Sequence, residues 1–241
     1  MTIVLECEFP MFFSYRIPDF SSQYALSSLF PGPSTIKLAI VATTVDYGGI
    51  DKAREVFNDI KNAKIGIVPP KKIITVNVLI RRLKAIKEFH TKVLPNNLKL
   101  LREGKIKLFN TFEKTYGIRG YVQFSEPIKI VINNLKDENT IRSIATKIGR
   151  IGSYDSIVFC RESNIGEETN IVWADENIKN LENGEYIILP VKDLKNDIGF
   201  DDINPFSLTS KKRDKKVMKK AYYLVPIKKK INGKNWSVII T

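Results

Sequence analysis

The sequence predicts an α+β protein in which residues 1–160 form a ferredoxin-like βαββαβ domain and residues 161–241 form a smaller β-rich region. Three observations support this fold class. Short segments with alternating apolar residues indicate strands, and apolar residues at i, i+3 and i+4 spacing between them indicate helices. The length of 241 residues suits one or two domains, and a hydrophobic content of 43% is enough to bury a substantial core.

The N-terminal segments predict a strand followed by helices. Residues 2–9 alternate in polarity and predict a half-buried strand. Residues 16–34 contain three prolines and a glycine, which exclude regular structure. Ser34 is then the expected N-cap of a short helix over residues 35–45. A second short helix is expected over residues 51–62.

The middle of the chain predicts two central strands separated by an insertion. Residues 72–83 alternate strongly and predict one strand, and residues 116–124 with 128–132 predict the next. Residues 84–114 between them are basic and weakly periodic, which indicates an extended insertion. One face of the first of these strands carries Ile74, Val76, Val78 and Ile80.

The remaining elements complete the predicted order. Residues 138–148 have helical spacing, and residues 156–160 predict the last strand of the ferredoxin-like unit. In the β-rich region the strand candidates are residues 186–191, 221–227 and 236–240.

The two cysteines, Cys7 and Cys160, fall on the first and last predicted strands, which are neighbours in this topology. We interpret them as two buried free thiols, because free cysteine is among the most buried residue types. A disulfide is the alternative. Two cysteines are too few for a disulfide scaffold or a zinc site and fit an intracellular protein, so a cytoplasmic location is expected.

The positive charge is concentrated in two windows. The net charge is +13, with 13 basic and 3 acidic side chains in residues 71–119, and 11 basic and 1 acidic in residues 211–234. Residues 154–204 hold 4 basic and 12 acidic side chains. The excess predicts binding to a polyanion, most often nucleic acid, although a solvated basic surface is the alternative. The acidic window is expected to face a protein neighbour.

Other classes of protein are disfavoured by the sequence. The longest apolar stretch is interrupted by Lys37 and is far shorter than the roughly 18–20 residues of a membrane span. Residues 1–9 carry two acids and no basic segment of a signal peptide. Motifs for a P-loop, a zinc protease or a serine hydrolase are absent. We therefore expect no membrane partner, no small-molecule substrate, no metal and no cofactor.

Two short stretches carry a resemblance to a known family. The first comprises Arg16-Ile-Pro-Asp, then Gln23, then the run Phe30-Pro-Gly-Pro-Ser-Thr-Ile-Lys-Leu-Ala. The second reads Tyr116-Gly-Ile-Arg-Gly-Tyr-Val-Gln-Phe-Ser-Glu-Pro. Both resemble CRISPR-associated protein family five, although Leu38 stands where that family usually has glycine.

The resemblance implies a repeat-associated RAMP fold and a role in antiviral defence. Such a protein binds and caps the 5′ handle of the CRISPR RNA (crRNA) in a type I Cascade complex. Its partners would be the backbone subunits and the large signature subunit, with target DNA contacted indirectly. The insertion at about residues 84–114 would be a thumb that wedges against the RNA. Archaeal type I-A members are the most similar, with type I-D an alternative.

Residues near the first helix are candidate RNA contacts. Ser34 and Thr35 at the helix start could bind phosphate, with Lys37 adding charge, although a plain N-cap is the alternative. Tyr15 is a candidate stacking platform and Arg16 a phosphate or base contact. Phe12 and Phe13 are expected in the core, and the resemblance adds Gln23 to the candidates.

A second group of candidates lies on the middle strands and the insertion. Its basic members are expected to contact phosphates, which positions RNA rather than reading its bases, and a solvated loop is the alternative. On residues 116–124, two side chains point outward, where related sheets contact RNA. The group comprises Arg81, Arg82, Lys84, Lys105, Lys107, Arg119 and Tyr121.

Catalysis rests on a single candidate. His90 is the one histidine, and we interpret it as a surface residue, because nothing in the sequence forms a catalytic group around it. We therefore expect a non-catalytic subunit, as most members of the resembled family are. The leading alternative is a metal-independent endoribonuclease that processes CRISPR precursor RNA with His90 as its base. A general basic RNA-binding protein is the third possibility.

Overall fold

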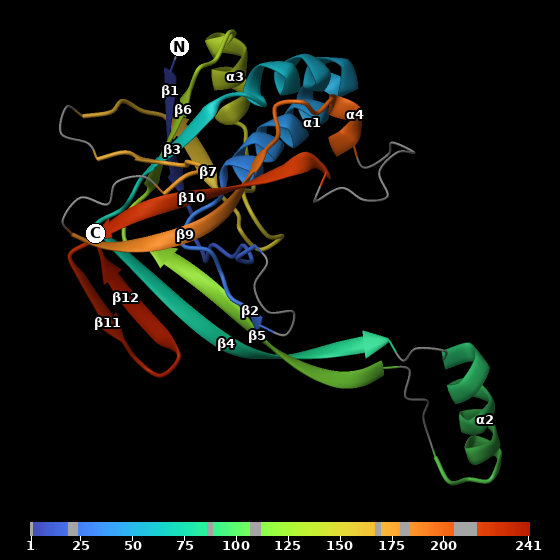
Figure 1. Cartoon of the computed structure of the whole chain (residues 1–241). Helices are drawn as coiled ribbons and strands as arrows, with labels where there is room; N and C mark the ends of the chain where they lie inside the picture. Colours follow the sequence, from blue (N-terminus) through green and yellow to red (C-terminus); the bar gives the residue numbers. More distant parts are fainter. Residues whose placement is uncertain are drawn as a thin grey trace.

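The computed structural model describes residues 2–18, 24–85, 89–106, 112–166, 170–178, 184–204 and 216–241. Within these residues the protein is a mixed α+β fold with three sheets (Figure 1). None of the helices in the described part is both long enough and apolar enough to span a membrane. The predicted α+β class is confirmed.

The first sheet is antiparallel throughout and has the strand order β7-β1-β6-β3-β8. Helix α1 (Pro33–Ile60) and helix α3 (Glu138–Ala145) pack against it. Ile3 and Leu5, from one face of β1, lie in the core shared with these helices. The strands are β1 (Thr2–Glu8), β3 (Lys64–Val68), β6 (Ile128–Asn133), β7 (Phe159–Glu162) and β8 (Val172–Trp173).

Helix α1 contains both helices that the sequence predicts, joined across a break at Gly49. Gly49 has φ +77°, a conformation that glycine adopts without steric cost. The expectation that Ser34 caps the helix is wrong. Gly32 is the N-cap and Pro33 begins the helix, because the fixed φ of proline suits the first helical position.

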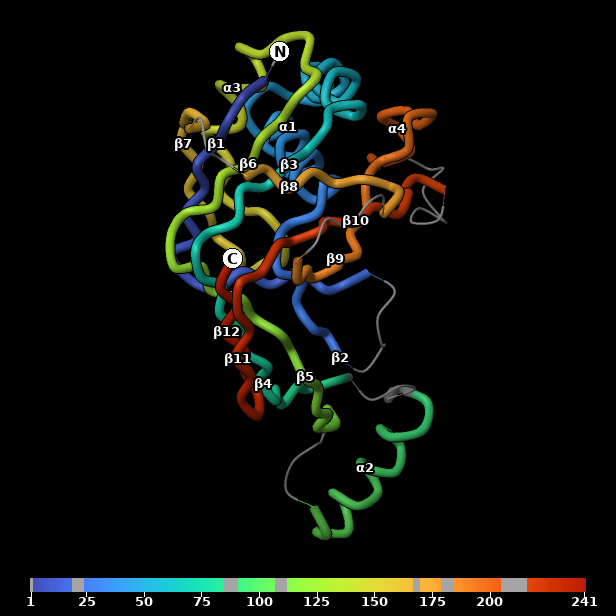
Figure 2. Tube along the Cα trace, turned by 60° about the vertical axis from the view of Figure 1, so that its left-hand side comes forward, coloured from blue at the N-terminus to red at the C-terminus, as the bar shows by residue number. Residues whose placement is uncertain are grey.

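The second sheet contains a long hairpin that projects from the rest of the molecule (Figure 1, Figure 2). Its order is β11-β12-β4-β5-β2, and the pairing of β4 with β5 runs from Ile73 opposite Phe124 to Ala85 opposite Phe112. Helix α2 (Leu94–Arg102), which follows the π-helical turn Phe89–Val93, lies at the far end. We call this β4–α2–β5 unit the arm. The strands are β2 (Tyr24–Ala25), β4 (Lys72–Ala85), β5 (Phe112–Phe124), β11 (Lys229–Asn232) and β12 (Trp236–Ile240).

The arm corrects the predicted strand assignment. The sequence places residues 72–83 and 116–124 in the same sheet as residues 2–9, but those positions belong to β3 and β6. The alternating pattern of β4 does not mark the core, because Ile73 is its one buried residue among those whose burial is described. Alternation shows that a strand has two unlike faces, not which sheet it joins.

The third sheet is the hairpin of β9 (Glu185–Leu194) and β10 (Met218–Ile227). Its inner face adds Leu189, Val191 and Tyr223 to the same core as α1, and α4 (Phe200–Ile203) follows β9. Strands from residues 161–241 therefore join all three sheets. The division of the chain into two domains stays a prediction.

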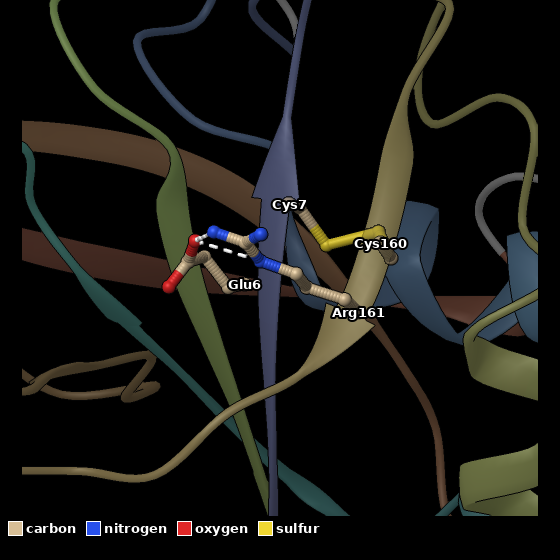
Figure 3. Close-up of a disulfide and its surroundings, with 4 residues drawn as sticks. All are labelled: Glu6, Cys7, Cys160 and Arg161. Carbon is tan, nitrogen blue, oxygen red and sulfur yellow. Dashed lines mark hydrogen bonds and ion pairs between the residues drawn. A yellow bond between two sulfur atoms is a disulfide. The ribbon is translucent and has the colours of Figure 1, made fainter.

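Cys7 and Cys160 form a disulfide between β1 and β7 (Figure 3). They lie opposite each other in the strand register, with Cα atoms 4.2 Å apart. The adjacent pair, Glu6 and Arg161, forms an ion pair across the same strands. The predicted proximity of the cysteines is confirmed, and their interpretation as free thiols is wrong.

Candidate nucleic-acid interface

Arg119 and Tyr121 lie on the outward face of the sheet at the base of the arm. The register places Val78 opposite Arg119 and Val76 opposite Tyr121. Paired residues in an antiparallel ladder share a face. The sheet therefore presents a mixed apolar, aromatic and basic surface, as the sequence predicts for these two residues.

An aromatic hollow of about 480 Å³ opens on this face. The rings of Phe12 and Tyr121 lie 5.7 Å apart within it. Phe12 is 42% exposed, so its expected place in the core is wrong, whereas Phe13 is fully buried as predicted. The hollow is lined by Met11, Phe12, Val76, Val78, Tyr121, Tyr154, Asp155 and Ile157.

Arg119 contacts two residues that line the aromatic hollow, Asp155 and Tyr121. Its Nη2 donates to Oδ2 of Asp155 at 2.8 Å and to Oγ of Ser153 at 3.0 Å. Its guanidinium carbon lies 5.3 Å from the ring centroid of Tyr121. Arg119 therefore supports the ring of Tyr121. Because its guanidinium is already paired with the carboxylate of Asp155, an RNA phosphate would have to compete with Asp155 to bind Arg119.

A second depression, the helix groove, runs between one face of α1 and the segment 147–157, with a volume of about 690 Å³. Two stacked pairs of cation and ring lie along it: Lys147 lies 5.1 Å from the ring of Tyr47, and Arg150 lies 5.2 Å from the ring of Tyr154. The groove also contains Tyr15, Thr35, Leu38, Ala39, Ala42, Thr43, Asp46, Gly149, Gly152 and Ile157.

The groove and the hollow are continuous. Tyr154 and Ile157 line both of them. Tyr154 is 84% exposed, so its ring is available from the groove and from the hollow. Aromatic rings interleaved with cations are the chemistry of single-stranded nucleic acid binding, in which bases stack and phosphates pair.

At the start of α1, one of the two predicted phosphate-binding residues reaches the groove and the other does not. Thr35 lines the groove, and its buried Oγ1 has no hydrogen-bond partner among the described residues. Ser34 is buried, with its side chain covered by the fold. The structure therefore brings Tyr15 and Thr35 together in the groove and leaves Ser34 beneath the surface.

Lys37 is not available to a phosphate, which corrects its expected role. Its side chain is 1% exposed, and its Nζ donates to Oδ1 of Asp193 at 2.7 Å and to the carbonyl of Lys61 at 2.9 Å. Desolvation lowers the pKa of the Lys37 ammonium, and the Asp193 carboxylate opposes that shift. Lys37 ties α1 to β9 instead.

Basic candidates continue along the arm. Arg81, Arg82 and Lys84 are exposed on β4, and Lys84 lies 3.6 Å from Glu113 on the paired strand. Lys105 is exposed after α2 and pairs with Glu103 at 2.8 Å. The arm thus presents cations to solvent, some of them with acidic neighbours.

The remaining candidates line neither the helix groove nor the aromatic hollow, or lie outside the described residues. Arg16 is exposed, and its backbone bridges to Ser27. Gln23 and Lys107 lie outside the described residues, as does the side chain of His90, whose backbone is in the turn Phe89–Val93. In the described part of the chain no three His, Cys, Asp or Glu side chains gather as a metal site.

Sequence reasoning missed the residues that join the two depressions. They follow α3 in the run Gly149-Arg150-Ile151-Gly152-Ser153-Tyr154. Gly152 has φ +106°, and a Cβ there would lie 2.9 Å from the ring of Phe13. A basic and an aromatic residue among glycines is a signal that could have identified this loop.

The fold and this surface define an α+β protein with a basic, aromatic face and a projecting arm. The chain belongs to the Cas5 family of CRISPR-associated proteins. It is 35% identical over 243 residues to the CRISPR-associated protein Cas5 of Archaeoglobus fulgidus, covering 98% of this chain and 97% of that protein. The family that the two sequence stretches resemble is thereby confirmed.

Solved structures give weaker matches. A crystal structure of a CRISPR protein from Archaeoglobus fulgidus has a TM-score of 0.46 at 15% identity, covering 100% of this chain and 92% of that one. A chain of the Type III-B Cmr-beta complex, bound to cognate target RNA and AMPPnP, has a TM-score of 0.37 at 14% identity, covering 98% and 86%. No family profile matches the chain. Family membership rests on the sequence match alone.

Proposed function

We propose that this protein is a non-catalytic RNA-binding subunit of a type I CRISPR effector complex and that it binds and caps the 5′ handle of the crRNA. The continuity of the helix groove with the aromatic hollow through Tyr154 and Ile157 carries the proposal. A single strand can follow this path with bases against the rings of Tyr15, Tyr154 and Tyr121. Lys147 and Arg150 are placed for its phosphates.

We further propose that the β7-β1-β6-β3 part of the first sheet, with α1 and α3, is the ferredoxin-like RAMP unit. Its antiparallel order and the position of one helix after β1 and one after β6 support this. The arm would then be the thumb. It leaves the chain between β3 and β6, where that fold has its central connection.

The partners in this proposal are the backbone subunits and the large signature subunit, with target DNA contacted indirectly. The positive charge of the arm suits the guide RNA, and the acidic window at residues 154–204 suits a protein neighbour. The type I-A subtype, an archaeal source and a cytoplasmic location belong to the same proposal.

Binding of handle RNA by the full chain tests the function. Fluorescence anisotropy would compare labelled handle RNA with a scrambled RNA of equal length at raised salt, where non-specific binding weakens most. We expect the handle RNA to remain bound and Tyr154→Ala to weaken it about tenfold, the loss of one stacking contact. The matched control is Phe159→Ala, an exposed aromatic on β7 that lines neither depression.

Two results would contradict the proposal. If binding of the handle RNA and of the scrambled RNA weakened equally as the salt concentration was raised, the protein would be a general RNA-binding protein. A single defined cut of repeat RNA in EDTA, abolished by His90→Ala, would indicate the metal-independent endoribonuclease instead.

A further inference from the structure

The solvent face of the β9–β10 hairpin carries an aromatic pocket of about 310 Å³. Along β10, Tyr222, Leu224 and Pro226 line the pocket, while Tyr223 and Val225 between them are fully buried. Alternate residues of a strand point to opposite faces. The outer row is therefore free to form a binding surface while the inner row completes the core.

Two further rings form the walls. Tyr186 on β9 lies opposite Pro226 and shares its face. Trp173 on β8 packs over Gly66, where a Cβ would lie 2.9 Å from the indole ring. Glycine at this position lets the indole approach the backbone of β3 closely, and the partly exposed ring lines the pocket.

Asp175 supplies the charge. Its backbone N–H donates to the carbonyl oxygen of Tyr222 at 3.1 Å, and its carbonyl oxygen accepts from the N–H of Tyr222 at 2.7 Å. These two hydrogen bonds hold Asp175 beside the pocket. Asp175 is the one charged side chain that lines the pocket within the described residues. Glu185, beside Tyr186, is exposed, and Glu176 is paired with Lys219.

These chemical features select a cation. Ring faces attract an ammonium or guanidinium group, and a carboxylate pairs with it, whereas an anionic phosphate would be repelled by the carboxylate. Eight of the eleven residues that line the pocket belong to the acidic window, which holds 12 acidic and 4 basic side chains in a chain of net charge +13. The other three, on β10, are the uncharged Tyr222, Leu224 and Pro226. None of the residues that line it lines the helix groove or the aromatic hollow.

We propose that this pocket receives the lysine or arginine side chain of a neighbouring protein. The side chain would lie against Trp173 and Tyr222 with its charged group at Asp175. The proposal does not depend on RNA binding, because the two surfaces share no lining residue.

The fluorescence of Trp173 gives a direct test with the full chain. The protein has two tryptophans, and Trp236→Phe leaves Trp173 as the single reporter. The probe is N-acetyl-arginine amide, compared with N-acetyl-citrulline amide, in which a neutral urea replaces the guanidinium. We expect a saturable change in emission with the arginine probe and at least fivefold weaker binding of the citrulline probe.

Asp175→Asn is expected to weaken the arginine probe at least fivefold, with Glu126→Gln as a carboxylate control outside the pocket. Both are near-isosteric exchanges, and circular dichroism would verify their folding. The proposal is overturned by the absence of a saturable change up to tens of millimolar, by equal response to both probes, or by an equal response to uridine monophosphate.

Discussion

Individual side chains show how far residue type predicts a role. Phe12 and Phe13 are identical in chemistry, yet Phe13 is fully buried and Phe12 contacts Tyr121 at the surface. Lys37 sits in the stretch that resembles the family, but its ammonium is buried against Asp193. Residue type sets what a side chain can do, and its neighbours in space decide which of these it does.

Tyr223 predicts a pH dependence of stability. Burial raises the pKa of its phenol well above the ordinary value, with a further contribution from Asp193. The unfolded chain releases this proton near pH 10, while the folded chain retains it. The contribution of Tyr223 to the free energy of unfolding is therefore fully present below about pH 10. Above that pH it falls by about 1.4 kcal/mol per pH unit until the folded-state phenol also ionises.

Tyr223→Phe should remove this contribution. Urea unfolding of both proteins between about pH 9 and pH 11 would show the wild type losing stability more steeply than the variant. Parallel curves would contradict the prediction. The phenol hydroxyl donates a long bond of 3.4 Å to the carbonyl of Pro31, so the cost of the variant at neutral pH should be small.

Short elements gain their stability from what they are joined to. β7 is a four-residue strand at the edge of the first sheet, and it follows the loop that carries Arg150 and Tyr154. The Cys7–Cys160 disulfide and the Glu6–Arg161 ion pair attach it to β1. The loop between the helix groove and the aromatic hollow is thus anchored close to its C-terminal end.

The disulfide predicts a dependence of stability on redox conditions. It closes a sequence separation of 153 residues, and a loop of that length contributes about 3–5 kcal/mol by restricting the unfolded chain. Adding reductant should lower the free energy of unfolding by that amount. The Cys7→Ser/Cys160→Ser variant should unfold equally with and without reductant. Two titratable thiols in denatured, unreduced protein would contradict the bond.

At the scale of the whole molecule, the outer part of the arm beyond the pair Ala85–Phe112 contributes little to the stability of the core. The core joins all three sheets, with residues from β1 and β6, from β9 and β10, and with Ile73, Val122 and Ile239 from the second sheet. Helix α2 buries none of its residues. Its position at the end of the long hairpin therefore contributes surface and charge rather than stability (Figure 1).

Removal of the outer arm tests this separation. Residues 86–111 can be replaced by Asn-Gly, because Ala85 and Phe112 are already paired and a two-residue turn closes such a ladder. We expect an unchanged denaturation midpoint. Binding of the handle RNA should weaken. The logarithm of its association constant should also fall less steeply with the logarithm of the salt concentration, because cations that pair with phosphates are lost. A large drop in stability would contradict the separation of the outer arm from the core.

The sequence by itself determined the α+β class, most helices and strands, the proximity of Cys7 and Cys160, and the outward direction of Arg119 and Tyr121. These follow from local periodicity, which is a property of neighbouring residues along the chain. It also indicated the family, which the match to an archaeal Cas5 then confirmed.

Only the tertiary structure decided which sheet each strand joins, which phenylalanine is buried, and that Lys37 pairs with Asp193. These depend on contacts between residues far apart in the chain, such as the 156-residue separation of that pair. It also brought Tyr15 and Thr35 to the same groove as Arg150 and Tyr154. The free energy of such contacts comes from burial and pairing in space, which local pattern does not encode.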